Sequence, residues 1–159
     1  MTTRRSTARA VKHRFEEWAT EAEPRLRQAL VAAFGQQVGV EVTAEALAYA
    51  WENFEDVLEK ANPVGYVYGV ARNLARRAVA PRRVVFPPVA VDRTPDVEPG
   101  LPAAVAGLPE QQRIVVTLLY GFEWTMSEVA EFLDIAKTSV QNHAERGLRT
   151  LRSELGVAQ

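Results

Sequence analysis

The chain has 159 residues, of which 47% are hydrophobic and 25% are charged, and its formal net charge is −1. This composition is typical of a globular protein with one domain or two small ones, and it excludes a largely disordered chain. The lack of cysteine excludes disulfides and thiolate metal sites, and no apolar run is long enough for membrane insertion, so we expect a cytoplasmic protein.

The first half of the sequence predicts three helices, because its apolar residues recur at helical rather than strand spacing. We expect one helix at about 10–34, ended by Gly35, and another at about 40–60. A third helix should begin at Asn62-Pro63, a capping residue followed by a proline in the first turn, and fade near residue 80.

The second predicted helix has an apolar side and an acidic side. The apolar side, which we expect in the core, consists of Leu47, Ala50, Trp51, Phe54, Val57 and Leu58. The acidic side contains no lysine or arginine and consists of Glu41, Glu45, Glu52, Glu55 and Glu59. Such a stripe is either a solvated face or a docking surface for a basic partner helix, and the pattern leaves both interpretations open.

The third predicted helix is basic on one side. That side holds Gly69, Arg72, Asn73, Arg76 and Arg77, and Tyr66 and Tyr68 lie near the start of the helix. Cations beside aromatic rings suit single-stranded nucleic acid, because the cations neutralise phosphates and the rings stack on bases. A solvated arginine face with tyrosines in the core is the alternative.

A proline-rich stretch at 81–100 predicts an extended linker between two halves. We therefore expect one helical domain at 1–80 and another at 101–159. In the second domain, helices are expected at 101–106 and at 109–120, the latter ended by Gly121. The sequence Thr125-Met-Ser-Glu128 is a capping box that should begin a further helix.

The segment MSEVAEFLDIAKTSVQNHAERGLRTLR, residues 126–152, predicts a helix-turn-helix. A short helix ends near Leu133, and the turn at 134–136 separates it from a longer helix. The apolar residues that would pack the motif are Val129, Phe132, Leu133, Ile135, Val140, Ala144, Gly147, Leu148 and Leu151.

The start of the longer helix is polar, as expected for a helix that enters a major groove. Its candidate base-reading residues are Lys137, Thr138, Ser139, Gln141 and Asn142, since Gln and Asn can bond base edges. Arg146, Arg149 and Arg152 lie further along and would suit phosphates. A pair of packed helices without any DNA partner can show a similar pattern.

Four segments together resemble a bacterial extracytoplasmic-function (ECF) sigma factor. They are FEEWATEAEPRLRQALVAAFG, TAEALAYAWENF, NPVGYVYGVARNLARR and LPEQQRIVVTLLYGFEWTMSEVAEFLDIAKTSVQNHAERGLRTLR. The resemblance covers nearly the whole chain from Phe15 onward. It implies an all-α fold of two small helical domains with a flexible linker, and an initiation factor that binds core RNA polymerase. In this family the first domain reads and opens the −10 element, and the second reads the −35 element.

The resemblance also implies a role for each group of residues. Glu41, Glu45 and Glu52 would belong to the surface that docks on the clamp helices of the polymerase β′ subunit. The residues on the −10 side would be Tyr66, Arg72, Asn73, Arg76 and Arg77. The residues on the −35 side would be Lys137, Thr138, Ser139, Gln141, Asn142, Arg146 and Arg149. The implied partners are core RNA polymerase, including its β flap, and promoter DNA, and the resemblance leaves room for an anti-sigma factor.

The chain departs from the family pattern at several positions. At four positions where the family usually has Asp, Glu or Gln, this chain has other residues. They are Val38, Val40, Thr43 and Ala44. Tyr66 replaces a usual tryptophan, and His143 stands where arginine is frequent. In the family, the linker follows the path of the nascent RNA, and Asp92, Asp96 and Glu98 would resemble the charge of that RNA. A solvated tether is the other interpretation of the linker.

We expect neither a catalytic centre nor a cofactor. The sequence has no phosphate-binding loop, no Ser/His/Asp grouping beyond chance, and two histidines that are too few and too far apart for a metal centre. The polymerase would perform the chemistry. The alternative function is a non-sigma transcriptional regulator that uses only the helix-turn-helix, and it would leave the acidic stripe and the arginine helix without partners.

Overall fold

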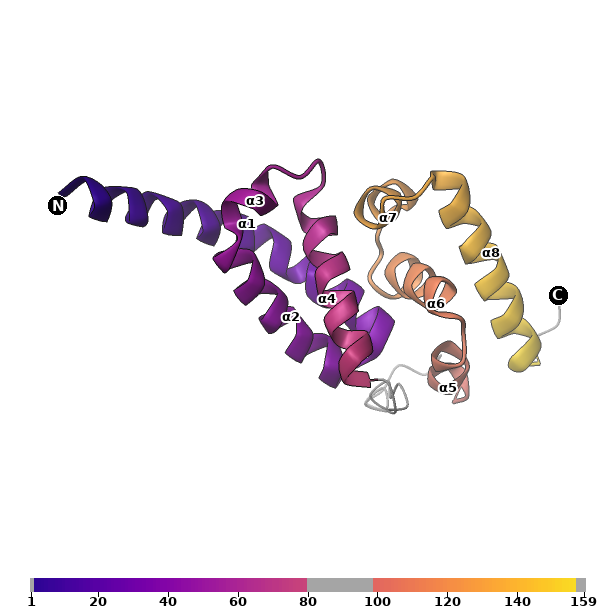
Figure 1. Ribbon diagram of the computed structural model, residues 1–159. Helices are drawn as coiled ribbons and strands as arrows, with labels where there is room; N and C mark the ends of the chain where they lie inside the picture. The colour runs from indigo at the N-terminus through magenta and orange to yellow at the C-terminus, as the bar shows by residue number, and fades with distance from the viewer. Residues whose placement is uncertain (1, 80–98, 157–159) are drawn as a thin grey trace.

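The computed structural model describes residues 2–79 and 99–156 (Figure 1). Within these ranges the elements are α1 (Thr2–Phe34), α2 (Gln36–Glu52), α3 (Phe54–Leu58), α4 (Pro63–Val79), α5 (Leu101–Ala106), α6 (Glu110–Val116), a π-helical turn (Thr117–Gly121), α7 (Met126–Leu133) and α8 (Lys137–Glu154). The predicted all-α class is confirmed for these residues. The predicted linker lies outside them except for its last two residues, and so do Asp92, Asp96 and Glu98.

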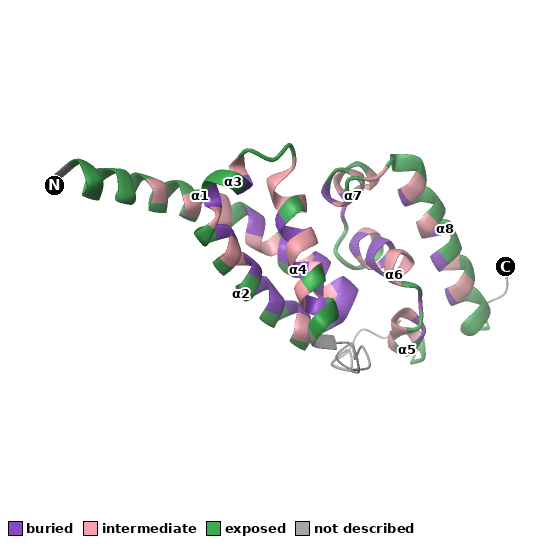
Figure 2. Cartoon of the chain, viewed as in Figure 1, coloured by how far each residue is buried: buried purple, intermediate pink, exposed green. Residues whose placement is uncertain are grey.

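Helix α1 begins earlier than predicted and ends where predicted. Its first part carries Arg4, Arg5 and Arg9, is largely exposed, and projects away from the other helices (Figures 1 and 2). The helix ends before Gly35, which has a φ of 87°. This left-handed conformation is readily adopted by glycine because it has no Cβ. None of the described helices combines the length and apolar character that a membrane span requires.

Helices α1 and α2 form a hairpin that depends on a close approach at Gly39. A Cβ atom at this position would lie 2.6 Å from the backbone nitrogen of Val31. Because that neighbour is backbone, a larger residue could be accommodated only by moving the two helices apart. The absence of a Cβ at Gly39 therefore allows the close approach of α1 and α2.

The predicted helix at 40–60 is wrong in its length, because the chain breaks at Asn53. The side-chain amide and the backbone N–H of Asn53 both donate to the carbonyl oxygen of Tyr49, at 3.0 Å each. An asparagine side chain that bonds a nearby carbonyl competes with regular helix bonding. The break turns Phe54 and Val57 into the core, whereas Trp51, predicted to be in the core, is 45% exposed.

Helix α4 begins as predicted. The side-chain oxygen of Asn62 accepts a hydrogen bond from the backbone N–H of Gly65 at 3.1 Å, which caps the helix. The buried side of α4 includes Val67, Tyr68 and Ala71. The core interpretation of the two tyrosines is therefore correct for Tyr68, while Tyr66 is 37% exposed.

In the C-terminal half, the predicted helix at 109–120 changes its hydrogen bonding before it ends. The N–H of Phe122 donates to the carbonyl of Thr117 at 3.0 Å, five residues earlier. The cap at Thr125 is confirmed, because its hydroxyl accepts from the N–H of Glu128 at 3.1 Å. Helix α7 ends at Leu133, and the C-cap residue Asp134 has a φ of 54°, a left-handed conformation that aspartate tolerates better than most residues. The predicted turn of the helix-turn-helix is thus confirmed.

The two halves of the chain share a hydrophobic core. One buried cluster joins Leu26 and Leu30 of α1 to Ile114 of α6 and Val129 of α7. At this junction the rings of Tyr68 and Phe132 lie 5.1 Å apart, and those of Trp124 and Phe132 lie 5.3 Å apart. The indole N–H of Trp124 donates to the side-chain oxygen of Gln28 at 2.7 Å. The halves therefore pack on one another directly, while their division into two domains stays a prediction.

Candidate nucleic-acid and partner-binding surfaces

The acidic surface, which we define as Glu41, Glu45 and Glu52, lies on the outer side of α2. All three side chains are exposed, and none of them forms an ion pair with another described residue. The helix break places Glu55 in α3 and Glu59 beyond it, so the five predicted carboxylates do not form one continuous helical stripe. The carboxylates of the acidic surface remain available to an external cation.

Two of the unusual residues beside the acidic surface behave differently. Thr43 is buried, and its hydroxyl donates to the carbonyl of Gly39 at 2.6 Å. It therefore satisfies its hydrogen bond inside the protein and does not extend the acidic surface. Val40, in contrast, is 42% exposed and adds an apolar side chain to the same outer face of α2.

The arginine face, which we define as Tyr66, Arg72, Asn73, Arg76 and Arg77, lies along α4. Asn73, Arg76 and Arg77 are exposed, and Arg72 is half-buried. Tyr66 is held in place, since its hydroxyl lies 3.2 Å from that of Tyr49. The ammonium group of Lys60 lies 4.7 Å from the centroid of the Tyr66 ring. The predicted residues thus gather on one helix, with one side of the aromatic ring close to a cation.

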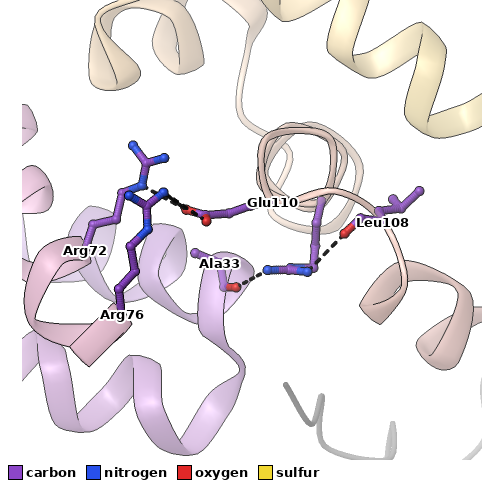
Figure 3. Close-up of polar contacts among 6 residues, drawn as sticks. Ala33, Arg72, Arg76, Leu108 and Glu110 are labelled. Carbon is purple, nitrogen blue, oxygen red and sulfur yellow. Dashed lines mark hydrogen bonds and ion pairs between the residues drawn. The ribbon is translucent and has the colours of Figure 1, made fainter. Parts of the chain in front are cut away.

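Two members of the arginine face are paired with Glu110, which begins α6 (Figure 3). The Nε of Arg72 donates to Oε1 of Glu110 at 2.8 Å. The Nη2 of Arg76 lies 3.1 Å from Oε2 and 3.3 Å from Oε1 of the same carboxylate. Sequence reasoning missed this partner, because a glutamate in the first turn of a helix is already explained by the helix dipole.

Arg113, one turn further along α6, makes a second polar link between the halves (Figure 3). It is 8% exposed, and its guanidinium donates to the carbonyls of Ala33 at 2.6 Å and Leu108 at 3.1 Å. Burial lowers the pKa of Arg113. Since Ala33 lies in the last turn of α1, the cation meets the negative end of that helix dipole, which favours its charged form.

The recognition face, which we define as the seven predicted −35 residues, lies on α8. The exposed members are Lys137, Thr138, Gln141, Asn142, Arg146 and Arg149, and Ser139 is half-buried. The opposite side of α8 is buried through Val140, Ala144 and Leu151. The side-chain amide of Gln141 donates a long hydrogen bond, 3.4 Å, to the carboxylate of Glu145. These residues therefore lie on the side of α8 away from its buried residues, and Figure 2 shows the exposed parts of this helix in green.

The distance between α8 and α6 is set by Gly147. A Cβ atom there would lie 2.7 Å from Cγ2 of Val116. The helix-turn-helix is thus held against α6 by a close contact that only a glycine permits without a shift. This packing fixes the direction in which the recognition face points.

Comparison with known proteins relates this geometry to a family. Residues 100–151 match the family model described as sigma-70, region 4. Among solved structures, the chain is similar to the sigma factor RpoE in complex with the anti-sigma factor NepR from Bartonella quintana. The sequence identity is 16% and the TM-score is 0.60, and the match covers 91% of this chain and 98% of that chain. At this identity the likeness concerns the fold. No curated protein matches the sequence.

Proposed function

We infer that this chain, whose residues 100–151 match sigma-70 region 4, is an ECF-type sigma factor that directs transcription initiation. The observation that carries this conclusion is the combination of the two matches. The region 4 match covers the helix-turn-helix, and the sigma-factor fold extends over 91% of the chain. A regulator that used only the helix-turn-helix would not account for the sigma-factor fold of the N-terminal half.

In this function each surface has a separate partner. The recognition face would read the −35 element as duplex, because a helix with exposed Gln, Asn and Arg side chains fits a major groove. The arginine face would hold the unstacked −10 strand through its cations and Tyr66. The acidic surface would dock on the β′ clamp helices of core RNA polymerase, whose β flap would contact the factor elsewhere. With these partners the factor would act in the cytoplasm.

The factor would contribute binding energy to promoter opening, and the polymerase would supply the chemistry. Melting is favoured when the separated bases are bound more tightly than the duplex. An anti-sigma factor is a further expected partner, since the similar RpoE structure contains one. The solvent-exposed acidic and recognition faces are the surfaces that such a partner would have to cover.

Run-off transcription tests the proposed function. DNA fragments from upstream of genes in the organism that makes this protein would be incubated with core polymerase purified from that organism, with and without this protein. The 5′ ends of the transcripts would then be sequenced. We expect new transcripts whose start sites share two upstream elements at a fixed spacing. If the protein adds no start sites although it binds the same DNA, it is a regulator of another kind.

A further inference from the structure

We propose that Glu110 competes with promoter DNA for the arginine face, so that the packed arrangement of the two halves is a closed form that must open before the −10 strand can bind. This inference rests on the function proposed above. In the proposed competition, the carboxylate of Glu110 and the phosphates of the DNA bind the same arginine side chains.

The carboxylate of Glu110 occupies the hydrogen-bond donors that a phosphate would use. A guanidinium binds carboxylates and phosphates with the same fork of N–H groups. Glu110 accepts from Arg72 at 2.8 Å and from Arg76 at 3.1 Å (Figure 3). One acidic side chain therefore satisfies two of the three arginines of the arginine face.

The remaining part of the arginine face stays accessible. Arg72 and Arg76 are one helical turn apart and point toward α6, whereas Asn73 and Arg77 form the neighbouring exposed row. A DNA strand could therefore first contact Asn73 and Arg77. It could reach Arg72 and Arg76 fully only by displacing Glu110, and this exchange couples DNA binding to the separation of α6 from α4.

Other contacts hold the closed form along the whole of α4. Near its start, the side-chain amide of Asn62 donates to the carbonyl of Glu131 in α7 at 2.7 Å. Along its buried side, Tyr68 packs against the ring of Phe132. The hydroxyl of Tyr68 has no hydrogen-bond partner among the described residues, so this junction carries an uncompensated polar group. Such a contact is less costly to open than a fully satisfied one.

The two ion pairs of Glu110 stabilise the closed form only moderately. The side chains of Arg72, Arg76 and Glu110 are 29%, 48% and 26% exposed. Partly exposed pairs stabilise weakly because solvent screens them. Removing both pairs should therefore increase the apparent affinity for single-stranded DNA by roughly three- to tenfold, by raising the open fraction.

A binding experiment tests the competition with a probe that needs no promoter sequence. Fluorescently labelled oligothymidylate presents phosphates on a flexible single strand, and its affinity is measured for the wild type and for three variants. Glu110→Gln removes the charge. Glu110→Asp keeps the charge but shortens the side chain, which separates the effect of the ion pairs from the effect of net charge. Glu154→Gln is the matched control, since Glu154 is exposed in the last turn of α8.

We expect higher affinity for both Glu110 variants and an unchanged affinity for Glu154→Gln. Circular dichroism confirms that each variant retains its helices. If Glu110→Gln binds no more tightly than Glu154→Gln, the competition does not exist. If Glu110→Gln alone gains affinity and Glu110→Asp does not, the effect is one of net charge and the proposal is wrong.

Energy transfer between two dyes measures opening directly, both without DNA and after DNA is added. The chain has no cysteine, so Ala48→Cys in α2 and Ser153→Cys in α8 provide the labelling sites, and both positions are exposed. The two helices lie on opposite sides of the packed molecule (Figure 1). We expect lower transfer efficiency in the Glu110→Gln background, and a decrease in the wild type when oligothymidylate is added.

The two results also separate this inference from the proposed function. Constant transfer efficiency on saturating DNA would show that binding does not require opening, and the inference would fall while run-off transcription stood. An absence of promoter-specific transcripts would overturn the sigma-factor function, even if Glu110→Gln opened the molecule.

Discussion

At the scale of single residues, Arg113 illustrates a contact that joins distant parts of the chain. Its guanidinium bridges the carbonyl groups near the ends of two helices, Ala33 in α1 and Leu108 after α5. In the sequence, an arginine after EQQ in a helix of mixed polarity looks like a solvated side chain. Nothing in its local spacing indicates a partner 80 residues earlier.

The exposed recognition residues, in contrast, were predictable from local pattern. Their exposure follows from the helical period, because Val140, Ala144 and Leu151 must face the core. Glu110 was missed for the same reason as Arg113, since both depend on packing between segments that are far apart in the sequence. Pattern therefore predicts which residues face outward, and only the fold shows which outward residues meet one another.

The proposed role of the recognition face predicts that base reading and backbone positioning can be separated by mutation. Gln141→Ala and Asn142→Ala should lower discrimination at particular −35 base pairs, by about 1–3 kcal/mol for each bidentate pair of hydrogen bonds that the substitution removes. Arg149→Ala should weaken binding to all sequences equally and reduce the salt slope by roughly one unit. Titration of a panel of −35 variants at several salt concentrations distinguishes these results. Unchanged relative affinities for the Gln141 and Asn142 variants would show that these residues are not the readers.

At the scale of helices, the sequence predicted the starts and ends that depend on one residue. Gly35, Asn62 and Thr125 mark boundaries through their own conformational or capping preferences, and each boundary is confirmed. The break at Asn53 was missed because an asparagine within a helical pattern is only mildly unfavourable. The π-helical turn after α6 was missed because a widened turn leaves the overall apolar spacing almost unchanged.

The close contact between α8 and α6 gives a prediction about stability. Gly147→Ala places a methyl group against Val116, because a Cβ at position 147 would lie only 2.7 Å from Cγ2 of Val116. It should therefore lower the free energy of unfolding by about 1–3 kcal/mol through overpacking. Gly69→Ala in α4 is the control, since nothing lies within 4 Å of a Cβ there. Because alanine has a higher helix propensity than glycine, Gly69→Ala should raise the free energy of unfolding by up to about 1 kcal/mol. Urea denaturation of both variants measures the difference, and equal effects would contradict the close approach at Gly147.

The acidic surface of α2 gives a prediction about polymerase binding. Glu41→Lys with Glu45→Lys places two cations against a proposed basic helix. The change should weaken association with core polymerase by several kcal/mol, on the order of 2–5, because like charges then meet in the interface. Helical content should not change, since both side chains are exposed. Titration of labelled protein with core polymerase measures the affinity.

A matched control isolates position from charge. Glu17→Lys with Glu21→Lys on α1 repeats the same spacing and the same change of net charge on exposed residues. This control should bind core polymerase nearly as well as the wild type. If both double variants lost the same amount of affinity for core polymerase, the acidic surface would be a solvated face and not a docking surface.

At the scale of the whole molecule, the sequence predicted two helical halves but not their packing. Val129 was predicted to pack the helix-turn-helix, and in the structure it joins Val67 of α4 and Ile114 of α6 in one cluster that spans both halves. A pattern shows that a side chain is apolar, but it does not show which of several apolar neighbours will cover it. The shared core is consequently a property of the assembled chain.

The packing changes what removal of the two paired arginines should do. Arg72→Ala with Arg76→Ala deletes the ion pairs to Glu110 and also deletes two of the proposed DNA donors, so it should favour opening of the protein and weaken the proposed hold on the −10 strand. The first effect concerns partly exposed pairs worth about 0.2–1 kcal/mol each. The second removes charge-assisted bonds to phosphate of about 1.5–3 kcal/mol each. The weaker hold on DNA should therefore dominate, and open-complex formation should fall.

Permanganate footprinting of the −10 region, with duplex binding at the −35 element measured in parallel, checks this balance. We expect reduced thymine reactivity in the Arg72, Arg76 double variant, while −35 binding changes little because the recognition face is on α8. Arg77→Ala is the informative comparison, since Arg77 is exposed in the neighbouring row of α4 and its loss would remove a proposed DNA donor while leaving the ion pairs to Glu110 in place. It should reduce melting by a smaller factor than the double variant. Normal melting in the double variant would mean that the arginine face does not contact the melted strand, and the pairing with Glu110 would then be a structural link alone.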